Sequence, residues 1–354
     1  EKKCYQHYYG EFEQYLTDNE NMNIVFYPIF YGFKNQSDGI KLLRQSKVNY
    51  LVPDDYLSII DYVWIMFRSV MFLTIKIPHS SFRGVEITKL LYSEIYRKSF
   101  SWNCISALLN YRVSMKLAKL NIKFKKLIVW SENQVTDRGL TLGFQTYFPK
   151  VPIMAYKGYP ISEQYLFHNI PSESEIDNKV HSKNIGIIGK GYSDSIMSYS
   201  SNINVSVVPA LRYEYIFNDR GNENISEQEK VIFIALPMDY DESIAIIEIF
   251  VDFLSNYSVV LKVHPATIDV IKNRILEKYK AYNFIWADEN LFAYLSDAFV
   301  FVTNNSSAAM VALADGVPVI IVNTKASIAQ IPVPTNISMD LYKICYTKTE
   351  VKLA

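Results

Sequence analysis

Two short apolar stretches of the chain stop abruptly at polar residues that could bind a phosphate. Residues 259–263 are followed by His264 and Pro265. Residues 298–303 are followed by four amide or hydroxyl side chains, Asn304, Asn305, Ser306 and Ser307. Ligands of a parallel α/β sheet bind beyond the carboxyl ends of its strands. If these stretches are adjacent strands, an imidazole and a pair of hydroxyls meet at one edge of the sheet.

A helix of small residues is predicted over residues 308–314, directly after the two serines, and Gly316 ends it. A helix N-terminus offers free backbone N–H groups and a partial positive charge, which suit a phosphate. His264 could donate a hydrogen bond to a phosphate oxygen or act as a general acid. The plainer alternatives are a loop histidine that faces solvent and serines that only cap the helix. The combination at two strand ends favours a nucleotide-phosphate site.

A third apolar stretch, residues 123–131, ends at Glu132, Asn133 and Gln134. A carboxylate directly after a buried strand is placed to remove a proton from a sugar hydroxyl as a general base. We therefore select Glu132 as the candidate base and its two neighbours as substrate-binding candidates. The alternative is that Glu132 caps the following helix.

Two more substrate-binding candidates, Gly189 and Arg212, follow other predicted strands. Arg212 could hold a carboxylate or a phosphate through two parallel hydrogen bonds, or form an ordinary salt bridge between domains. Gly189 begins a Gly-Lys-Gly turn that is too short for a dinucleotide-binding or P-loop motif. Both kinds of motif are also missing after the first strands, so we disfavour those two classes of protein.

Alternating apolar strands and helices predict the framework that must position these residues. In the first half, strands are expected at residues 23–27, 48–52, 123–131, 151–156 and 184–188. In the second half they are expected at residues 205–208, 231–236, 259–263, 284–286, 298–303 and 318–322. This pattern predicts an α/β fold of two Rossmann-like domains that face a central cleft. The acceptor-side domain would span residues 1–203 and the nucleotide-binding domain residues 204–335, while residues 336–354 pack back on the first domain.

Composition narrows the class of protein. The 36 Lys and Arg residues balance the 36 Asp and Glu residues, which argues against a general nucleic-acid-binding protein. The three cysteines have neither disulfide nor metal spacing, which favours a reducing compartment such as the cytoplasm. No Asp-x-Asp element stands directly at the end of a predicted strand, so we expect no metal ion. A start at Glu1 rather than at a methionine is compatible with a missing native N-terminal segment.

Residues 62–78 are strongly apolar but too short for a membrane-spanning helix, and they include Arg68 and Lys76. We interpret them as a buried helix or strand pair. The alternative is a surface at the membrane interface that docks a lipid-linked acceptor.

The motifs also carry a resemblance to known families. Lys262-Val263-His264-Pro265 with Asn305-Ser306-Ser307 resembles the His-Pro and Ser-Ser motifs of bacterial sialyltransferases of the GT-B type. Glu132-Asn133-Gln134, Gly158 and residues 208–213 look like bacterial O-antigen and capsule biosynthesis proteins, a resemblance that covers residues 126–322. The resemblance to the sialyltransferases implies that Glu132 is the base and that His264, Ser306 and Ser307 stabilise the phosphate of departing CMP.

We therefore predict a glycosyltransferase that needs neither a metal nor a cofactor. It would transfer sialic acid or a related ulosonic acid from a CMP-activated donor to a hydroxyl of a bacterial surface glycan, such as O-antigen, lipopolysaccharide or capsule. The acceptor could be lipid-linked, with the protein in the cytoplasm or at the inner face of the plasma membrane.

Several alternatives stay open. Similar motifs in β-Kdo transferases and in glycerophosphotransferases of teichoic-acid synthesis allow CMP-Kdo or CDP-glycerol as the donor. A sugar-nucleotide 2-epimerase would share the fold but act on UDP-sugars without an acceptor. A non-catalytic protein that binds glycans or nucleotides would bind such a ligand without turning it over.

Overall fold

The computed structural model describes residues 8–10, 12–16, 23–28, 36–45, 48–218, 231–265, 267, 269–287, 295, 298–324 and 330–354. The chain divides into two compact units. The first comprises Glu1–Gly158, Phe167–Ile187 and Ser200–Ser206. The second comprises Tyr159–Leu166, Ile188–Tyr199 and Val207–Ala354. Each unit has its own sheet.

The first unit is built around a four-stranded sheet of order β3-β4-β5-β6. Its strands are β3 (Leu127–Trp130), β4 (Ile153–Lys157), β5 (Asn184–Ile187) and β6 (Asn204–Val207). Parallel pairing aligns Trp130 with Tyr156, and Lys157 with Ile187. All four strands lie where apolar stretches predicted them. The strands predicted at residues 23–27 and 48–52 form only a parallel bridge between Phe26 and Tyr50.

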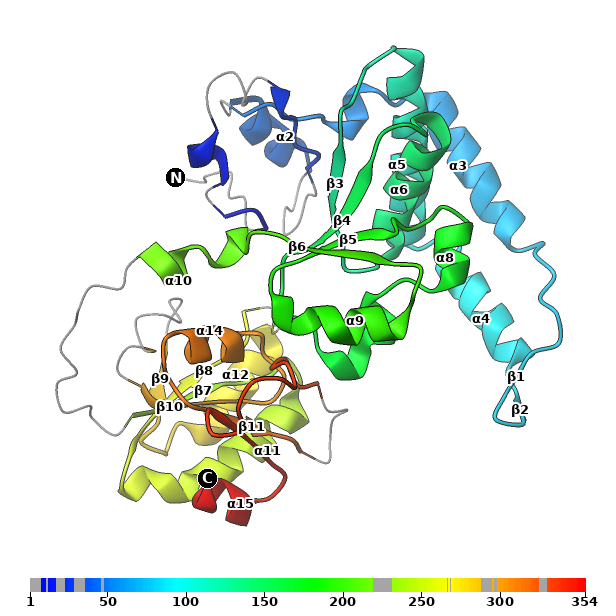
Figure 1. Ribbon diagram of the computed structural model, residues 1–354. Helices are drawn as coiled ribbons and strands as arrows, with labels where there is room; N and C mark the ends of the chain where they lie inside the picture. The colour runs from blue at the N-terminus through cyan, green and yellow to red at the C-terminus, as the bar shows by residue number, and fades with distance from the viewer. Residues whose placement is uncertain are drawn as a thin grey trace. The chain divides into compact units, whose positions relative to one another are not determined.

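Helices α5 (Trp102–Lys119) and α6 (Val135–Tyr147) lie side by side beside this sheet (Figure 1). Their backbones approach closely because Gly139 of α6 faces Ala107 of α5 without an intervening side chain. Helix α3 (Ile59–Phe72) packs on the other side of α5. The remaining elements of this unit are η1 (Phe12–Tyr15), α2 (Gln36–Gln45), η2 (Pro53–Asp55), β1 (Ser81–Phe82), β2 (Val85–Glu86), α4 (Thr88–Lys98), α7 (Leu166–Asn169, which begins at the unit boundary) and α8 (Glu173–Asp177). The short elements η3 (Glu163–Tyr165), η4 (Lys190–Tyr192) and α9 (Ser193–Tyr199) belong to the second unit.

The second unit contains a six-stranded parallel sheet of order β12-β11-β10-β7-β8-β9. Its strands are β7 (Val231–Ala235), β8 (Ser258–Lys262), β9 (Ile285–Trp286), β10 (Ala298–Thr303), β11 (Val319–Val322) and β12 (Tyr342–Cys345). Every residue of the central strand β7 is buried. A strand that is apolar on both faces requires cover on both faces, as in doubly wound α/β folds.

Two apolar cores provide that cover. Ile232 and Ile234 point into one core, and Val231 and Phe233 into the other. The first core includes side chains from α11 (Tyr240–Phe250), α12 (Asp269–Tyr279) and α15 (Lys348–Leu353). The second includes side chains from α14 (Ala308–Ala314), the helix predicted over the same residues. The other elements are η5 (Leu211–Tyr213), α10 (Tyr215–Asn218) and η6 (Val251–Ser255).

The C-terminal segment differs from our prediction. We expected residues 336–354 to pack back on the first domain. Instead, β12 pairs in parallel with β11 at the edge of the second sheet, and Val351 of α15 lies in the core of that unit. The edge of a sheet leaves backbone hydrogen-bonding groups open to another strand, and β12 satisfies those of β11.

Candidate functional site

Three neighbouring strands of the second sheet end level with one another. Parallel pairing aligns Thr303 of β10 with Ala235 of β7, and Ala235 with Lys262 of β8. His264 and Asn305 therefore both lie two residues beyond the same row of the sheet. Our expectation of adjacent strands is wrong because β7 stands between β8 and β10. Twice the usual strand spacing separates the two motifs, or about 10 Å at the backbone.

The sheet changes its direction of winding between β7 and β10. The chain passes from β7 to β8 and β9 on one side, and β10 then lies on the other side of β7. Such a reversal leaves a crevice beyond the strand ends, where open α/β sheets bind their ligands. His264 follows the strand on one side of β7 and residues 304–307 follow the strand on the other. The two predicted motifs therefore lie on opposite sides of β7, at the point where the winding reverses.

His264 is half-buried after the end of β8. Burial lowers the pKa of its imidazole, which favours the neutral ring at physiological pH. Its carbonyl oxygen accepts a hydrogen bond from the Thr267 N–H at 2.9 Å, which closes a turn that contains the exposed Pro265. A neutral imidazole can donate one hydrogen bond to a phosphate oxygen but contributes no charge.

The residues after β10 are anchored to the sheet. Thr303 Oγ1 donates to the carbonyl oxygen of Ala235 at 3.2 Å and accepts from the Ser306 N–H at 3.4 Å. Ser306 Oγ in turn accepts from the Ala308 N–H at 3.2 Å, where α14 begins. Ser306 thus bonds a free N–H at the start of α14, which is close to the plainer capping alternative, whereas the N-cap residue Ser307 makes no side-chain capping bond. Asn304 is buried, whereas Asn305 and Ser307 are half-buried.

Tyr213, which we did not select from the sequence, lies near two of the candidate residues. Burial raises the pKa of its phenol, while the Arg212 charge and the nearby Ser307 act to lower it, and the phenol oxygen is buried without a hydrogen-bond partner among the described residues. The Arg212 guanidinium carbon lies 5.8 Å from the centre of the Tyr213 ring. Tyr213 therefore lies near both the predicted Arg212 and the predicted Ser307. The sequence signal was its position directly after Arg212.

In the first unit, Glu132 follows β3 and is half-buried. Its Oε1 accepts a hydrogen bond from Trp130 Nε1 at 2.8 Å, and its Oε2 accepts one from Gln134 Nε2 at 2.8 Å. Asn133 is buried and adopts a left-handed φ of 57°, a conformation that asparagine tolerates better than most residues. The chain thereby turns sharply between the strand and α6. Two side-chain donors thus orient the Glu132 carboxylate.

The acid that caps α6 is Asp137, and not Glu132. Asp137 Oδ2 accepts hydrogen bonds from the Glu132 and Gln134 backbone N–H groups, each at 3.2 Å. Burial raises the pKa of Asp137, and these backbone bonds oppose the rise. The capping role that we considered for Glu132 therefore belongs to a residue five positions later, which leaves the Glu132 carboxylate available for other chemistry.

Lys157, the last residue of β4, is completely buried near these carboxylates. Burial lowers the pKa of its ammonium to about 7, and the negative charges of Asp137 and Glu132 oppose that fall. We did not select Lys157 from the sequence. The available signal was a lysine at the end of an apolar strand, directly before Gly158. Such a lysine is expected to be buried, and a buried lysine needs nearby carboxylates to remain charged.

A buried serine–histidine pair lies beside this cluster. Ser131 Oγ is 3.2 Å from His181 Nε2, and His181 Nδ1 is 2.7 Å from the carbonyl oxygen of Ser182. A carbonyl can only accept, so Nδ1 carries the proton and Nε2 accepts from the serine. Burial lowers the pKa of His181 to about 4, although the bond to Ser182 acts to raise it. The ring is therefore neutral at physiological pH.

The predicted site residues fall in both units. Glu132, Asn133 and Gln134 belong to the first unit, whereas Gly189, Arg212, His264 and residues 304–307 belong to the second. Gly189 precedes η4, and a methyl group added there would come no closer than 3.8 Å to Tyr192. Nothing in its surroundings therefore requires a glycine. In the described part of the chain, no group of three His, Cys, Asp or Glu side chains is arranged to hold a metal ion.

Comparison with solved structures identifies the architecture. The UDP-GlcNAc 2-epimerase of Methanocaldococcus jannaschii, in complex with UDP-GlcNAc and UDP, aligns with 88% of this chain and 85% of its own, with 12% identity and a TM-score of 0.50. The Neisseria meningitidis UDP-GlcNAc 2-epimerase bound to UDP-GlcNAc aligns over 84% and 73%, with 13% identity and a TM-score of 0.46. The glycosyltransferase of kitacinnamycin aligns over 78% and 76%, with 10% identity and a TM-score of 0.49. No protein-family model and no curated protein matches the sequence.

The protein therefore has the GT-B architecture of two Rossmann-like domains, and the predicted fold class is confirmed. The predicted function is wrong. A UDP-GlcNAc 2-epimerase shares this architecture over 88% of this chain. That finding supports the alternative of a sugar-nucleotide 2-epimerase over a transferase that uses a CMP-activated ulosonic acid. The glycan acceptor was predicted only as the substrate of that transferase, so nothing now supports it.

Proposed function

We propose that this protein is an enzyme that acts on a UDP-sugar and inverts one carbon of the sugar, as a sugar-nucleotide 2-epimerase does. The observation that carries the proposal is that β8, β7 and β10 end at the same level of the sheet. This places His264 and residues 304–307 on either side of β7, where the winding of the sheet reverses. In support, the M. jannaschii enzyme of the same architecture was solved with UDP-GlcNAc and UDP.

The second unit offers suitable groups for a diphosphate. His264 and Ser307 can each donate one hydrogen bond to a phosphate oxygen, and Asn305 can donate two. Arg212, which like Ser307 lies near Tyr213, supplies a positive charge and a planar pair of donors. About 10 Å between the two motifs leaves room for two phosphates rather than one. We propose that these side chains bind the diphosphate without a metal ion.

Inversion of a sugar carbon needs an acid–base group, because a proton must leave that carbon and another must return to its opposite face. We propose Glu132 for this role. Its carboxylate is oriented by Trp130 and Gln134 and is not used to cap α6.

Thermal unfolding with UDP, UMP, CDP and CMP tests the nucleotide site. A ligand that binds only the folded protein stabilises it by about 2.7 kcal/mol at a concentration 100 times its Kd. We expect UDP to raise the Tm most, and His264→Ala to weaken UDP binding about tenfold, which corresponds to one lost hydrogen bond of about 1.4 kcal/mol. His79→Ala, at an exposed histidine of the first unit, is the control and should bind UDP as the wild type does.

A preference for CMP, or equal binding by His264→Ala, would contradict the proposed site. Turnover is tested separately by incubation with UDP-GlcNAc in deuterated water and NMR of the sugar. We expect a second UDP-sugar with deuterium at the inverted carbon. UDP binding without any conversion would favour the non-catalytic nucleotide-binding protein.

A further inference from the structure

Helix α3 presents its apolar face to solvent and its polar face to the protein. Its buried stripe consists of Asp61, Ile65 and Ser69. Large apolar side chains occupy the opposite face, with exposed fractions from 50% for Val70 to 82% for Ile59. Those with at least half of their surface exposed are Ile59, Ile60, Val63, Met66, Phe67 and Val70. Our interpretation of residues 62–78 as a buried element is therefore wrong for α3.

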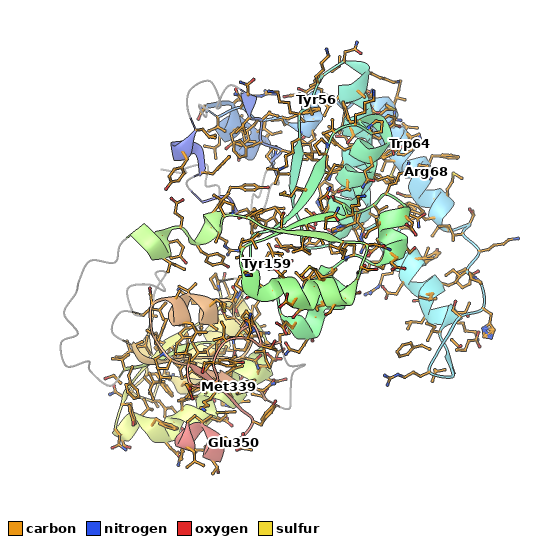
Figure 2. The ribbon with its side chains drawn as sticks, viewed as in Figure 1. Tyr56, Trp64, Arg68, Tyr159, Met339 and Glu350 are labelled. Atoms are coloured by element: carbon orange, nitrogen blue, oxygen red, sulfur yellow. The ribbon has the colours of Figure 1, made fainter. Side chains whose placement is uncertain are left out.

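The inward face fixes this orientation. Asp61 Oδ1 accepts a hydrogen bond from Arg112 Nε at 2.7 Å, and Asp61 Oδ2 lies 2.9 Å from Lys116 Nζ. Burial acts to raise the pKa of Asp61, but hydrogen bonds led by that from Lys116 hold it well below its usual range. Trp64, labelled in Figure 2, stacks on Tyr111 of α5 with ring centres 6.1 Å apart. Rotation of α3 would break these contacts, so its apolar face stays outward.

The apolar surface continues beyond α3. The β1–β2 hairpin and α4 extend from the end of α3 (Figure 1), and α4 has no buried residue. Phe82, Val85, Leu90 and Tyr96 of these elements are all at least 60% exposed. Single exposed apolar residues are ordinary, but a run of them across consecutive elements marks an interaction surface. We call residues 59–100 the α3–α4 arm.

Charge indicates which partner the arm takes. Its basic residues are Arg68, Lys76, Arg83, Lys89, Arg97 and Lys98. Of its acids, Asp61 is buried in ion pairs with residues outside the arm, and Glu94 pairs with Arg97. Apart from these pairs, the arm has one acid, Glu86, and the five other basic residues. The whole chain has no net charge, so this excess of cations is local. Two copies joined through the arm would bring like charges together, whereas an anionic lipid surface complements them.

The dimensions of α3 fit a position along a membrane and not across it. Its 14 residues span about 21 Å, which is shorter than the roughly 30 Å of a bilayer core. None of the described helices combines the length and apolar character needed to cross a membrane. An apolar face flanked by basic residues is typical of helices that lie in the headgroup region.

We infer that the α3–α4 arm binds the surface of an anionic lipid bilayer, with the apolar face of α3 inserted among the lipids and the basic residues against the headgroups. This surface is independent of the nucleotide site, because every residue proposed to bind the diphosphate belongs to the second unit.

Sedimentation with vesicles tests this inference on the full chain, with vesicles of phosphatidylcholine alone or mixed with phosphatidylglycerol. We expect wild type to bind the mixed vesicles and to be released partly by salt, which screens the charges. Ile60→Ser with Phe67→Ser should lower the partition at least about tenfold, as should Arg83→Glu with Lys89→Glu. The control is Val270→Ser with Lys272→Glu on α12, where Val270 is 75% exposed. It should bind as wild type does.

All variants change exposed side chains, so each should keep the wild-type Tm and its stabilisation by UDP. Three results would overturn the inference. The wild type could remain in solution with mixed vesicles, it could bind neutral vesicles equally well, or both arm variants could bind as strongly as the wild type. A wild-type dimer, measured by light scattering, that Ile60→Ser with Phe67→Ser converts to a monomer would overturn it too, because the arm would then bind a second copy.

Discussion

His181 links the stability of the first unit to pH. Its folded pKa of about 4 lies below the ordinary value of about 6.5, so in this window the unfolded chain binds more protons than the folded one. The free energy of unfolding should therefore fall by up to about 3 kcal/mol as pH drops from 6.5 to 4. The charged groups that face His181 are Lys157, Glu175 and Arg138, and the two cations reinforce the effect.

Urea denaturation of wild type and His181→Gln between pH 7 and pH 4 measures this contribution. The variant should lose clearly less stability than wild type across the window, whatever its stability at pH 7. His79→Gln, at an exposed histidine, should follow the wild-type curve. Parallel curves for wild type and His181→Gln would show that the buried ring does not control the acid sensitivity.

The contact between α5 and α6 depends on glycine. A Cβ added at Gly139 would lie 2.0 Å from the carbonyl oxygen of Ala107, which is backbone and cannot move aside. Alanine would favour the helix by about 1 kcal/mol, yet overpacking of this kind costs about 1–3 kcal/mol and occasionally more. We expect Gly139→Ala to lower the free energy of unfolding because the two helices must separate.

Gly189→Ala is the matched control. Its new Cβ would come no closer than 3.8 Å to another side chain, and its φ of −159° suits any residue. We expect a change within about 0.5 kcal/mol, measured by the same denaturation. A Gly139→Ala protein as stable as this control would mean that α5 and α6 are not as close as described. The same Gly189→Ala protein also shows whether UDP binding needs this glycine.

At the scale of the whole molecule, nucleotide binding and proton transfer are assigned to different units. Glu132 belongs to the first unit, and the proposed diphosphate ligands to the second. Mutation should therefore separate the two properties. Glu132→Gln keeps the shape of the side chain, so we expect stabilisation by UDP to remain while turnover falls at least about 100-fold.

Thermal unfolding with UDP and NMR of UDP-GlcNAc conversion measure the two properties on the same protein. Glu86→Gln on the exposed β1–β2 hairpin is the control and should change neither. Full turnover in Glu132→Gln would remove Glu132 from the acid–base role. Loss of UDP binding together with turnover in Glu132→Gln would instead show that nucleotide binding also depends on the first unit.

The sequence by itself determined the elements whose signals are local. Continuous apolar stretches located β7, β8, β10 and β11, because strands buried on both faces need apolar side chains throughout. Small residues and Gly316, which adopts a φ of 82°, located α14 and its end. The polar residues after the strands marked Glu132, His264 and Ser307, because a strand of a parallel sheet ends where its apolar stretch ends.

Only the tertiary structure decided which of these residues meet. The order of strands placed β7 between β8 and β10 and moved residues 342–345 to the edge of the second sheet. Folding also placed Lys157 near Asp137 and Asp61 beside Arg112, and the second of these contacts turned the apolar face of α3 outward. Such pairings join residues 20 to more than 50 positions apart. An apolar helix has the same local pattern whether its apolar face is buried or exposed. The contacts of the helix with other elements therefore decide the direction in which its apolar face points.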